Sequence, residues 1–159
     1  MFPICQKQRF VHLLYLGLIP AVLLCCSWKE TAGSLQGLEW INHCINRNFS
    51  AARSGRLKKW DLNINSEGFL RLRKYYPNGK EEYFSFNLLR LNTMIYLGTV
   101  NAGDIVFKTR GDDVIVQTYN DRKGNIDSMS TSFRLPVDNM EPEELDSLNR
   151  FLESYKDAK

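Results

Sequence analysis

The spacing of the apolar residues changes twice along the chain, and these changes constrain the fold more than any other feature of the sequence. From Leu38 to Phe49, apolar residues recur every three or four positions, which predicts an amphipathic helix over about residues 35–49. From Trp60, apolar residues alternate with polar ones or form short runs between turns, as in strands. After Asn139 the helical spacing returns. The sequence therefore predicts an α+β fold, with antiparallel strands between two helices.

The region between the two helices predicts about seven strands. Pro77-Asn78-Gly79-Lys80 is the clearest hairpin turn, because an Asn-Gly pair tolerates positive φ angles. Short clusters of Asn, Asp and Gly separate the other runs. The strands are expected at residues 60–64, 69–76, 81–86, 94–100, 104–109, 114–119 and 126–137.

The last predicted helix has the residues expected at a helix start. Asn139 can cap it, Pro142 suits its first turn, and the neighbouring glutamates complement its positive end. One face carries Leu145, Leu148, Leu152 and Tyr155. We expect this amphipathic helix to close a bent sheet or a barrel.

The first 28 residues have the composition of an export signal. Lys7 and Arg9 form a positive region, and Val11–Cys26 follows as an apolar stretch of 16 residues. A membrane-spanning helix needs about 20 apolar residues, whereas the apolar region of a signal peptide needs about 7–15. We therefore predict a signal peptide, with an uncleaved signal anchor over residues 11–26 as the alternative.

The end of this stretch resembles the processing site of bacterial lipoproteins. In Leu23-Leu24-Cys25-Cys26-Ser27, a leucine stands three residues before Cys26, which is then the predicted site of lipidation. Cys25 is the alternative acceptor. This interpretation divides the chain into a signal peptide (1–25), a tether (26–37) and one β-rich domain with N- and C-terminal helices (38–159). Fatty acyl chains such as palmitate on Cys26 would anchor the domain to the membrane.

The remaining cysteine and the net charge characterise residues 29–159, which we call the body of the chain. Cys44 is the one cysteine outside the leader, so no disulfide framework is expected within the domain. Removing Lys7 and Arg9 from the 21 Lys and Arg residues leaves 19, against 18 Asp and Glu residues. A body with a net charge of +1 gives no reason to expect nucleic-acid binding.

The usual catalytic and metal-binding patterns are weak in this sequence. His43 and Cys44 are adjacent, but neighbouring residues of a helix point about 100° apart, which disfavours a catalytic dyad. Asp121, Asn125 and Asp127 superficially resemble a calcium loop, but their spacing is not that of an EF-hand and suits a tight turn. We therefore predict no catalytic residue, metal ion or cofactor.

A basic segment follows the first predicted helix. Arg53, Arg56, Lys58 and Lys59 could form a surface for an acidic partner or for anionic lipid headgroups. The alternative is that these charges disperse over solvated positions on folding. Downstream, Arg71 and Arg73 alternate with leucines, as solvent-facing residues of a strand do.

Two resemblances follow from these features. The order of elements over about residues 56–157 resembles the pleckstrin-homology-like barrel, in which a C-terminal helix plugs one end of a bent sheet. The leader, together with Val114–Asp121 and Asp127-Ser128-Met129, resembles uncharacterised small lipoproteins of Gram-negative bacteria. The resemblance to lipoproteins implies a cell-envelope location, facing the periplasm or the cell surface.

From these observations we expect a protein that is not an enzyme. We expect an envelope lipoprotein that is tethered to the membrane and acts as a protein-interaction or assembly module with an envelope protein as its partner. One alternative is a ligand-binding or carboxylate-dependent enzymatic domain in the periplasm. The other is a signal-anchored bitopic scaffold.

Overall fold

A computed structural model describes residues 29–157 of the chain, and from Gly37 on these residues form one compact unit. The described part has two helices, eight strands and one short 3₁₀ helix. The helices are α2 (Lys29–Asn48) and α3 (Pro142–Asp157), and the 3₁₀ helix is η2 (Leu88–Arg90). The strands are β1 (Lys59–Ile64), β2 (Phe69–Tyr75), β3 (Glu81–Asn87), β4 (Leu91–Gly98), β5 (Ala102–Thr109), β6 (Val114–Tyr119), β7 (Asp127–Ser130) and β8 (Ser132–Asp138).

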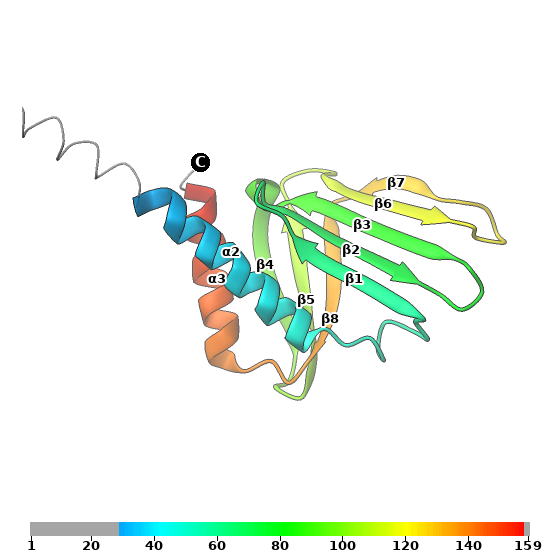
Figure 1. Cartoon of the computed structure of the whole chain (residues 1–159), viewed down its shortest axis with the longest axis horizontal. Coiled ribbons are helices and arrows are strands. Elements are labelled where there is room, and N and C mark those ends of the chain that lie inside the picture. Colours follow the sequence, from blue (N-terminus) through cyan, green and yellow to red (C-terminus); the bar gives the residue numbers. More distant parts are fainter. Residues whose placement is uncertain (1–28, 158–159) are drawn as a thin grey trace, which may run out of the picture. The chain divides into compact units, whose positions relative to one another are not determined.

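The strands form two antiparallel sheets (Figure 1). The five-stranded sheet has the order β1-β2-β3-β6-β7, and the three-stranded sheet has the order β4-β5-β8. The predicted α+β class with antiparallel strands is therefore confirmed. The two sheets do not close into a barrel, so the pleckstrin-homology-like closure expected from element order is not present in the described residues.

The strand count differs from the expectation at residues 126–137. This stretch was predicted as one strand, but it forms β7 in the five-stranded sheet and β8 in the three-stranded sheet. The chain passes from one sheet to the other at Thr131, which forms a bend between the two strands. Sequence periodicity cannot distinguish a long strand from two short strands that belong to different sheets.

The helix boundaries also shift from those predicted. The first helix was expected over about residues 35–49, and α2 runs from Lys29 to Asn48. Asn139 does not cap the C-terminal helix, because α3 begins three residues later and Asn139 has a φ of 53° in the preceding turn. The backbone amides of Glu144 and Leu145 donate to the carbonyl of Glu141, both at 3.1 Å.

The core lies between the inner faces of the sheets and the two helices. Phe86 of β3 lies 5.4 Å from Phe107 of β5, measured between ring centroids, and Phe84 lies 5.5 Å from Phe133 of β8. Around these rings, the helices contribute Leu38, Ile41, Ile45, Leu148, Leu152 and Tyr155, and the strands contribute Leu62, Ile64, Leu70, Leu72, Ile105 and Leu135. The apolar stripes read from the sequence are thus the buried faces.

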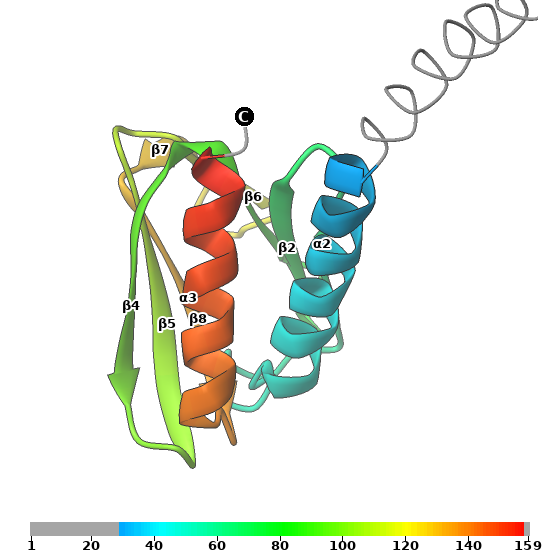
Figure 2. The ribbon, with the colours of Figure 1, turned by 90° about the vertical axis from the view of Figure 1, so that its left-hand side faces the viewer.

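The two helices lie side by side (Figure 2) and approach closely at a glycine. A Cβ atom added to Gly37 of α2 would lie 1.8 Å from Cε2 of Phe151 on α3. Because a real Cβ atom cannot approach that closely, the absence of a side chain at Gly37 permits this crossing.

Helix α2 also covers the edge of the five-stranded sheet. The Asn46 amide donates to the carbonyl of Leu62 at 2.8 Å, and Oδ1 of Asn42 accepts from the amide of Ile64 at 3.1 Å. These side chains therefore satisfy backbone groups at the free edge of β1.

Candidate functional site

The basic segment predicted as a partner surface connects α2 to β1, and its four cations do not share one environment. Arg56 and Lys58 are exposed and form no hydrogen bond or ion pair through their side chains with the described residues. Lys59 begins β1, with its ammonium 5.6 Å from the ring centroid of Tyr75. Arg53 instead turns toward the end of the three-stranded sheet.

The Arg53 side chain links the segment between α2 and β1 to the three-stranded sheet. Its guanidinium donates to the carbonyls of Gly103 at 2.6 Å and Val137 at 3.2 Å, and it pairs with Asp104 at 2.8 Å. Asp104 also pairs with Arg134 at 3.0 Å. The Arg53 guanidinium is consequently occupied by the fold itself, in contrast to Arg56 and Lys58.

The outer face of the five-stranded sheet carries basic and aromatic side chains from four of its strands, β1, β2, β3 and β6. The inner face carries Leu70 and Leu72, so the alternation of β2 turns Arg71 and Arg73 outward, as predicted. The register places side chains from β1, β3 and β6 beside them. We call this surface the basic–aromatic face: Lys59, Phe69, Arg71, Arg73, Tyr75, Tyr83 and Tyr119.

The guanidinium groups of this face lie over aromatic rings. The Arg73 guanidinium lies 5.7 Å from the ring centroid of Tyr75 and 5.8 Å from that of Tyr119, and it pairs with Glu81 at 3.1 Å. The Arg71 guanidinium lies 5.6 Å from the ring of Phe69. Cation–π contacts of this kind hold the guanidinium plane in a defined orientation.

Arg71 has unused hydrogen-bonding capacity within the basic–aromatic face. Its Nε atom is buried and has no hydrogen-bond partner among the described residues. A buried N–H without an acceptor is unfavourable, and a guanidinium next to an aromatic surface suits a carboxylate or a carbonyl oxygen. The cationic charge and the aromatic neighbours, rather than the shielded Nε atom, are therefore what this face offers to a ligand.

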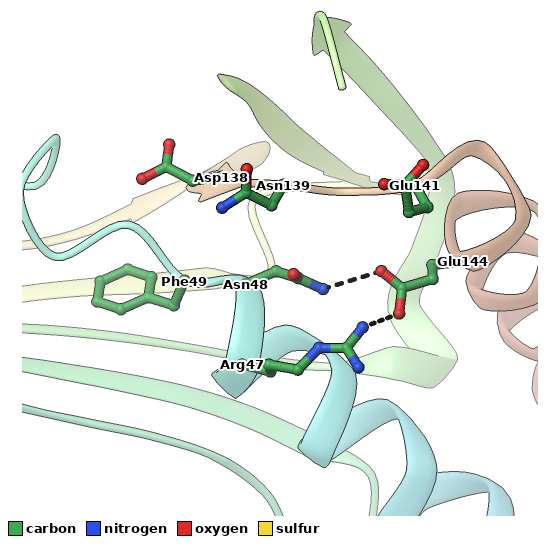
Figure 3. A pocket seen from close by; sticks show the side chains of 7 residues that line it. All are labelled: Arg47, Asn48, Phe49, Asp138, Asn139, Glu141 and Glu144. Carbon is green, nitrogen blue, oxygen red and sulfur yellow. Dashed lines mark hydrogen bonds and ion pairs between the residues drawn. The ribbon is translucent and has the colours of Figure 1, made fainter. Parts of the chain in front are cut away.

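A polar depression of about 440 Å³ lies where the C-terminal end of α2 meets the start of α3 (Figure 3). Arg47 pairs with Glu144, and the Asn48 amide donates to the same carboxylate at 3.2 Å. Phe49, Asp138, Asn139 and Glu141 complete the lining. Arg47 and Asn48 of α2 thus bind Glu144 of α3 and link the two helices at this depression.

A hydrogen-bonded group of charged side chains lies near the β2–β3 hairpin. Tyr76 donates to Glu82 at 2.8 Å, and Lys80 pairs with Glu82 at 3.0 Å and with Asp121 at 2.9 Å. Burial and the bond to Glu82 raise the pKa of Tyr76 to about 12. Burial lowers the pKa of Lys74, whose ammonium lies 5.4 Å from the Phe84 ring centroid.

The turn that superficially resembles a calcium loop is held by its own hydrogen bonds. Asp121 accepts from the amide of Lys123 at 2.9 Å, and Asn125 accepts from the amide of Asp121 at 3.1 Å. The bond from Lys123 and the pairing with Lys80 lower the pKa of Asp121. No group of three or more His, Cys, Asp or Glu side chains that could hold a metal ion occurs among the described residues.

His43 and Cys44 have different environments on α2. Cys44 is 2% exposed within the core, whereas His43 is exposed to solvent. Burial, and secondarily the charge of Glu144, raises the pKa of the Cys44 thiol, which disfavours the reactive thiolate.

The predicted lipidation site, Cys26 or alternatively Cys25, lies outside the described residues, as does the apolar stretch 11–26. Within residues 29–157, no helix is long and apolar enough to cross a membrane.

Neither the protein-family models, nor the curated protein sequences, nor the solved structures contained a match to this chain.

Proposed function

We propose that the chain is a membrane-anchored lipoprotein of the bacterial cell envelope, and that its folded domain binds another envelope protein without catalysing a reaction. The sequence of the leader supports the anchor: a positive region, an apolar stretch, and Cys26 preceded by leucines. The basic–aromatic face supports the binding role. The observation that carries the proposal is the set of arginine guanidinium groups that lie over aromatic rings on this face.

The chemistry of the basic–aromatic face indicates what kind of partner segment it would bind. Arginine and tyrosine are enriched at the energetic centres of protein interfaces, because they combine a large contact area with directional hydrogen bonds. Arg71 lies beside Phe69, and Lys59 extends the positive charge to the edge of the sheet. We propose that a carboxylate or backbone carbonyl of the partner accepts from Arg71 while its apolar side chains contact the aromatic rings.

The anchor is tested by the intact mass of the chain extracted from membranes. We expect loss of residues 1–25 and addition of a diacylglyceryl group to Cys26. The variant Cys26→Ala should retain its leader and lack the lipid, whereas Cys25→Ala should still be processed. An unmodified, full-length parent chain would reject the lipoprotein proposal.

The binding surface is tested separately, by recovery of cross-linked partners from intact cells. Arg71→Ala should reduce recovery of a specific partner, because it removes a guanidinium from the basic–aromatic face. Arg122→Ala is the matched control, since it removes the same charge from an exposed position outside both the basic–aromatic face and the basic segment. Equal recovery with the parent and with Arg71→Ala, or equal losses with both variants, would contradict a binding role for this face.

A further inference from the structure

The inner face of the five-stranded sheet is buried along only part of its length. Far from the β2–β3 turn, its side chains are at most 8% exposed: Ile64, Leu70, Phe86 and Val114. Farther toward this turn, the same face is only partly buried. Figure 1 shows β1, β2 and β3 continuing past β8 at this end. We call this part of the face the open inner surface: Trp60, Lys74, Phe84 and Val116.

Lys74 places a positive charge within this otherwise apolar surface. It forms no hydrogen bond or ion pair with the described residues, and its ammonium lies 5.4 Å from the ring centroid of Phe84. Glu82, directly opposite on β3, already accepts from Tyr76 at 2.8 Å and pairs with Lys80 at 3.0 Å. The Lys74 ammonium therefore has no counter-ion within ion-pair distance in the described part of the chain.

Two further cations lie near the open inner surface. The Lys58 amide donates to the Tyr75 carbonyl at 2.8 Å, and a Cβ atom added to Gly55 would lie 3.6 Å from Cε1 of Tyr76. The segment between α2 and β1 therefore runs along the β2–β3 hairpin, and it carries the exposed Arg56 and Lys58. Neither side chain pairs with a carboxylate of residues 29–157, so this end of the sheet attracts anions.

The rest of the open inner surface is apolar, and its central strands have no free backbone groups. β2 and β3 pair with a strand on both sides, so their N–H and C=O groups are used within the sheet. The Trp60 ring lies 4.8 Å from that of Phe49, and the Phe84 ring lies 5.5 Å from that of Phe133, measured between centroids. Both rings are held in place, while part of each stays exposed. The surface therefore suits a ligand with one anionic group and an apolar body.

We propose that the open inner surface binds a long-chain carboxylate, a ligand of the fatty-acid class. The carboxylate accepts from the Lys74 ammonium, and the acyl chain contacts Phe84 and Val116. Neighbouring strands lie about 4.8 Å apart, so these contacts extend over about 10 Å, from β2 to β6. A peptide would bring backbone polar groups that find no partner here, and their burial is unfavourable. The open inner surface and the basic–aromatic face lie on opposite sides of the same sheet, so the two kinds of binding are separate.

Photo-cross-linking of the full-length chain in native membranes tests this proposal. The probe is palmitate with a diazirine in its chain, and the labelled peptides are identified by mass spectrometry. We expect labels on the peptides that contain Phe84 or Val116, and competition by unlabelled palmitate. The alcohol with the same chain and diazirine should label these peptides at least about tenfold less, because it lacks the charge that pairs with Lys74.

Substitutions of Lys74 give a second readout with the same probe. Lys74→Met keeps an unbranched side chain but removes the charge, and should reduce labelling at least about tenfold, whereas Lys74→Arg should retain most of it. Lys108→Met is the matched control, because Lys108 is an exposed lysine on a strand of the other sheet.

Three outcomes would overturn the inference. They are equal labelling by the acid and the alcohol, equal labelling of Lys74→Met and Lys108→Met, and labels confined to peptides outside the open inner surface. The comparison of acid with alcohol uses the parent chain, so it does not depend on how the variants fold. None of these results bears on the basic–aromatic face, which has its own test.

Discussion

Replacing Arg53 with alanine should destabilise the domain, although Arg53 belongs to a segment that looks in the sequence like a free basic surface. The side chain connects the segment after α2 to β5 and β8. Its guanidinium donates to two carbonyl oxygens, of Gly103 and Val137, and pairs with the carboxylate of Asp104. The guanidinium also lies 3.9 Å from a carboxylate oxygen of Asp138, and alanine removes all four contacts at once.

The size of the effect follows from these contacts and from the exposure of the side chain. A hydrogen bond that involves a charged group contributes about 1.5–3 kcal/mol, and an exposed ion pair about 0–1 kcal/mol. Because 37% of the Arg53 side chain is exposed, water can replace part of what is lost. We therefore expect a loss of about 1–2 kcal/mol in the free energy of unfolding. A domain of this size loses about 3–5 °C in Tm per kcal/mol.

Urea unfolding of the full-length chain, followed by far-ultraviolet circular dichroism, measures this loss. Arg56→Ala is the matched control and should change the free energy of unfolding by less than about 0.5 kcal/mol, since Arg56 is exposed. Arg53→Lys should recover part of the loss, because lysine keeps the charge but lacks the planar fork.

Equal unfolding midpoints for Arg53→Ala and Arg56→Ala would refute the conclusion that Arg53 stabilises the domain through its contacts with β5 and β8. The result also affects the design of binding experiments. A charge reversal that includes Arg53 would weaken partner capture through loss of the fold, so only Arg56, Lys58 and Lys59 are suitable for testing this segment as a binding surface.

Three further predictions concern other parts of the domain. Gly37→Ala should lower the Tm, because its Cβ would overlap Phe151, even though alanine by itself favours a helix by about 1 kcal/mol. Tyr76 should titrate near pH 12 by tyrosinate absorbance, and, because its pKa is raised on folding, its contribution to stability should be present below pH 10 and lost toward pH 12. The Cys44 thiol, which is 2% exposed, should react with maleimide only in denaturant, as measured by peptide mass spectrometry.

Each of these predictions has its own control. A rise in Tm for Gly37→Ala would show that helix propensity outweighs the crossing of the helices, and Phe151→Ala in the same chain should relieve the overlap. Tyr76→Phe should remove the late absorbance transition and reduce the fall in stability above pH 10. Rapid labelling of Cys44 in the native chain would contradict its place in the core.

The elements that depend on local pattern were predictable. The apolar stripe from Leu38 to Ile45 and the stripe from Leu148 to Tyr155 became the buried faces of α2 and α3. The outward direction of Arg71 and Arg73 followed from simple alternation. These features were readable because side chains repeat with the period of the element that carries them, whatever the rest of the fold does.

The sequence by itself thus determined the α+β class, the two amphipathic helices and the outward side of β2, since local periodicity and turn residues decide these. Only the tertiary structure decided that residues 126–137 divide between two sheets and that the sheets stay open. It also distinguished Arg53, held by carbonyls from β5 and β8, from Arg56 nearby in the chain, and left part of the inner face of the five-stranded sheet uncovered. These outcomes depend on contacts between residues far apart in the sequence, and such contacts leave no period in the chain.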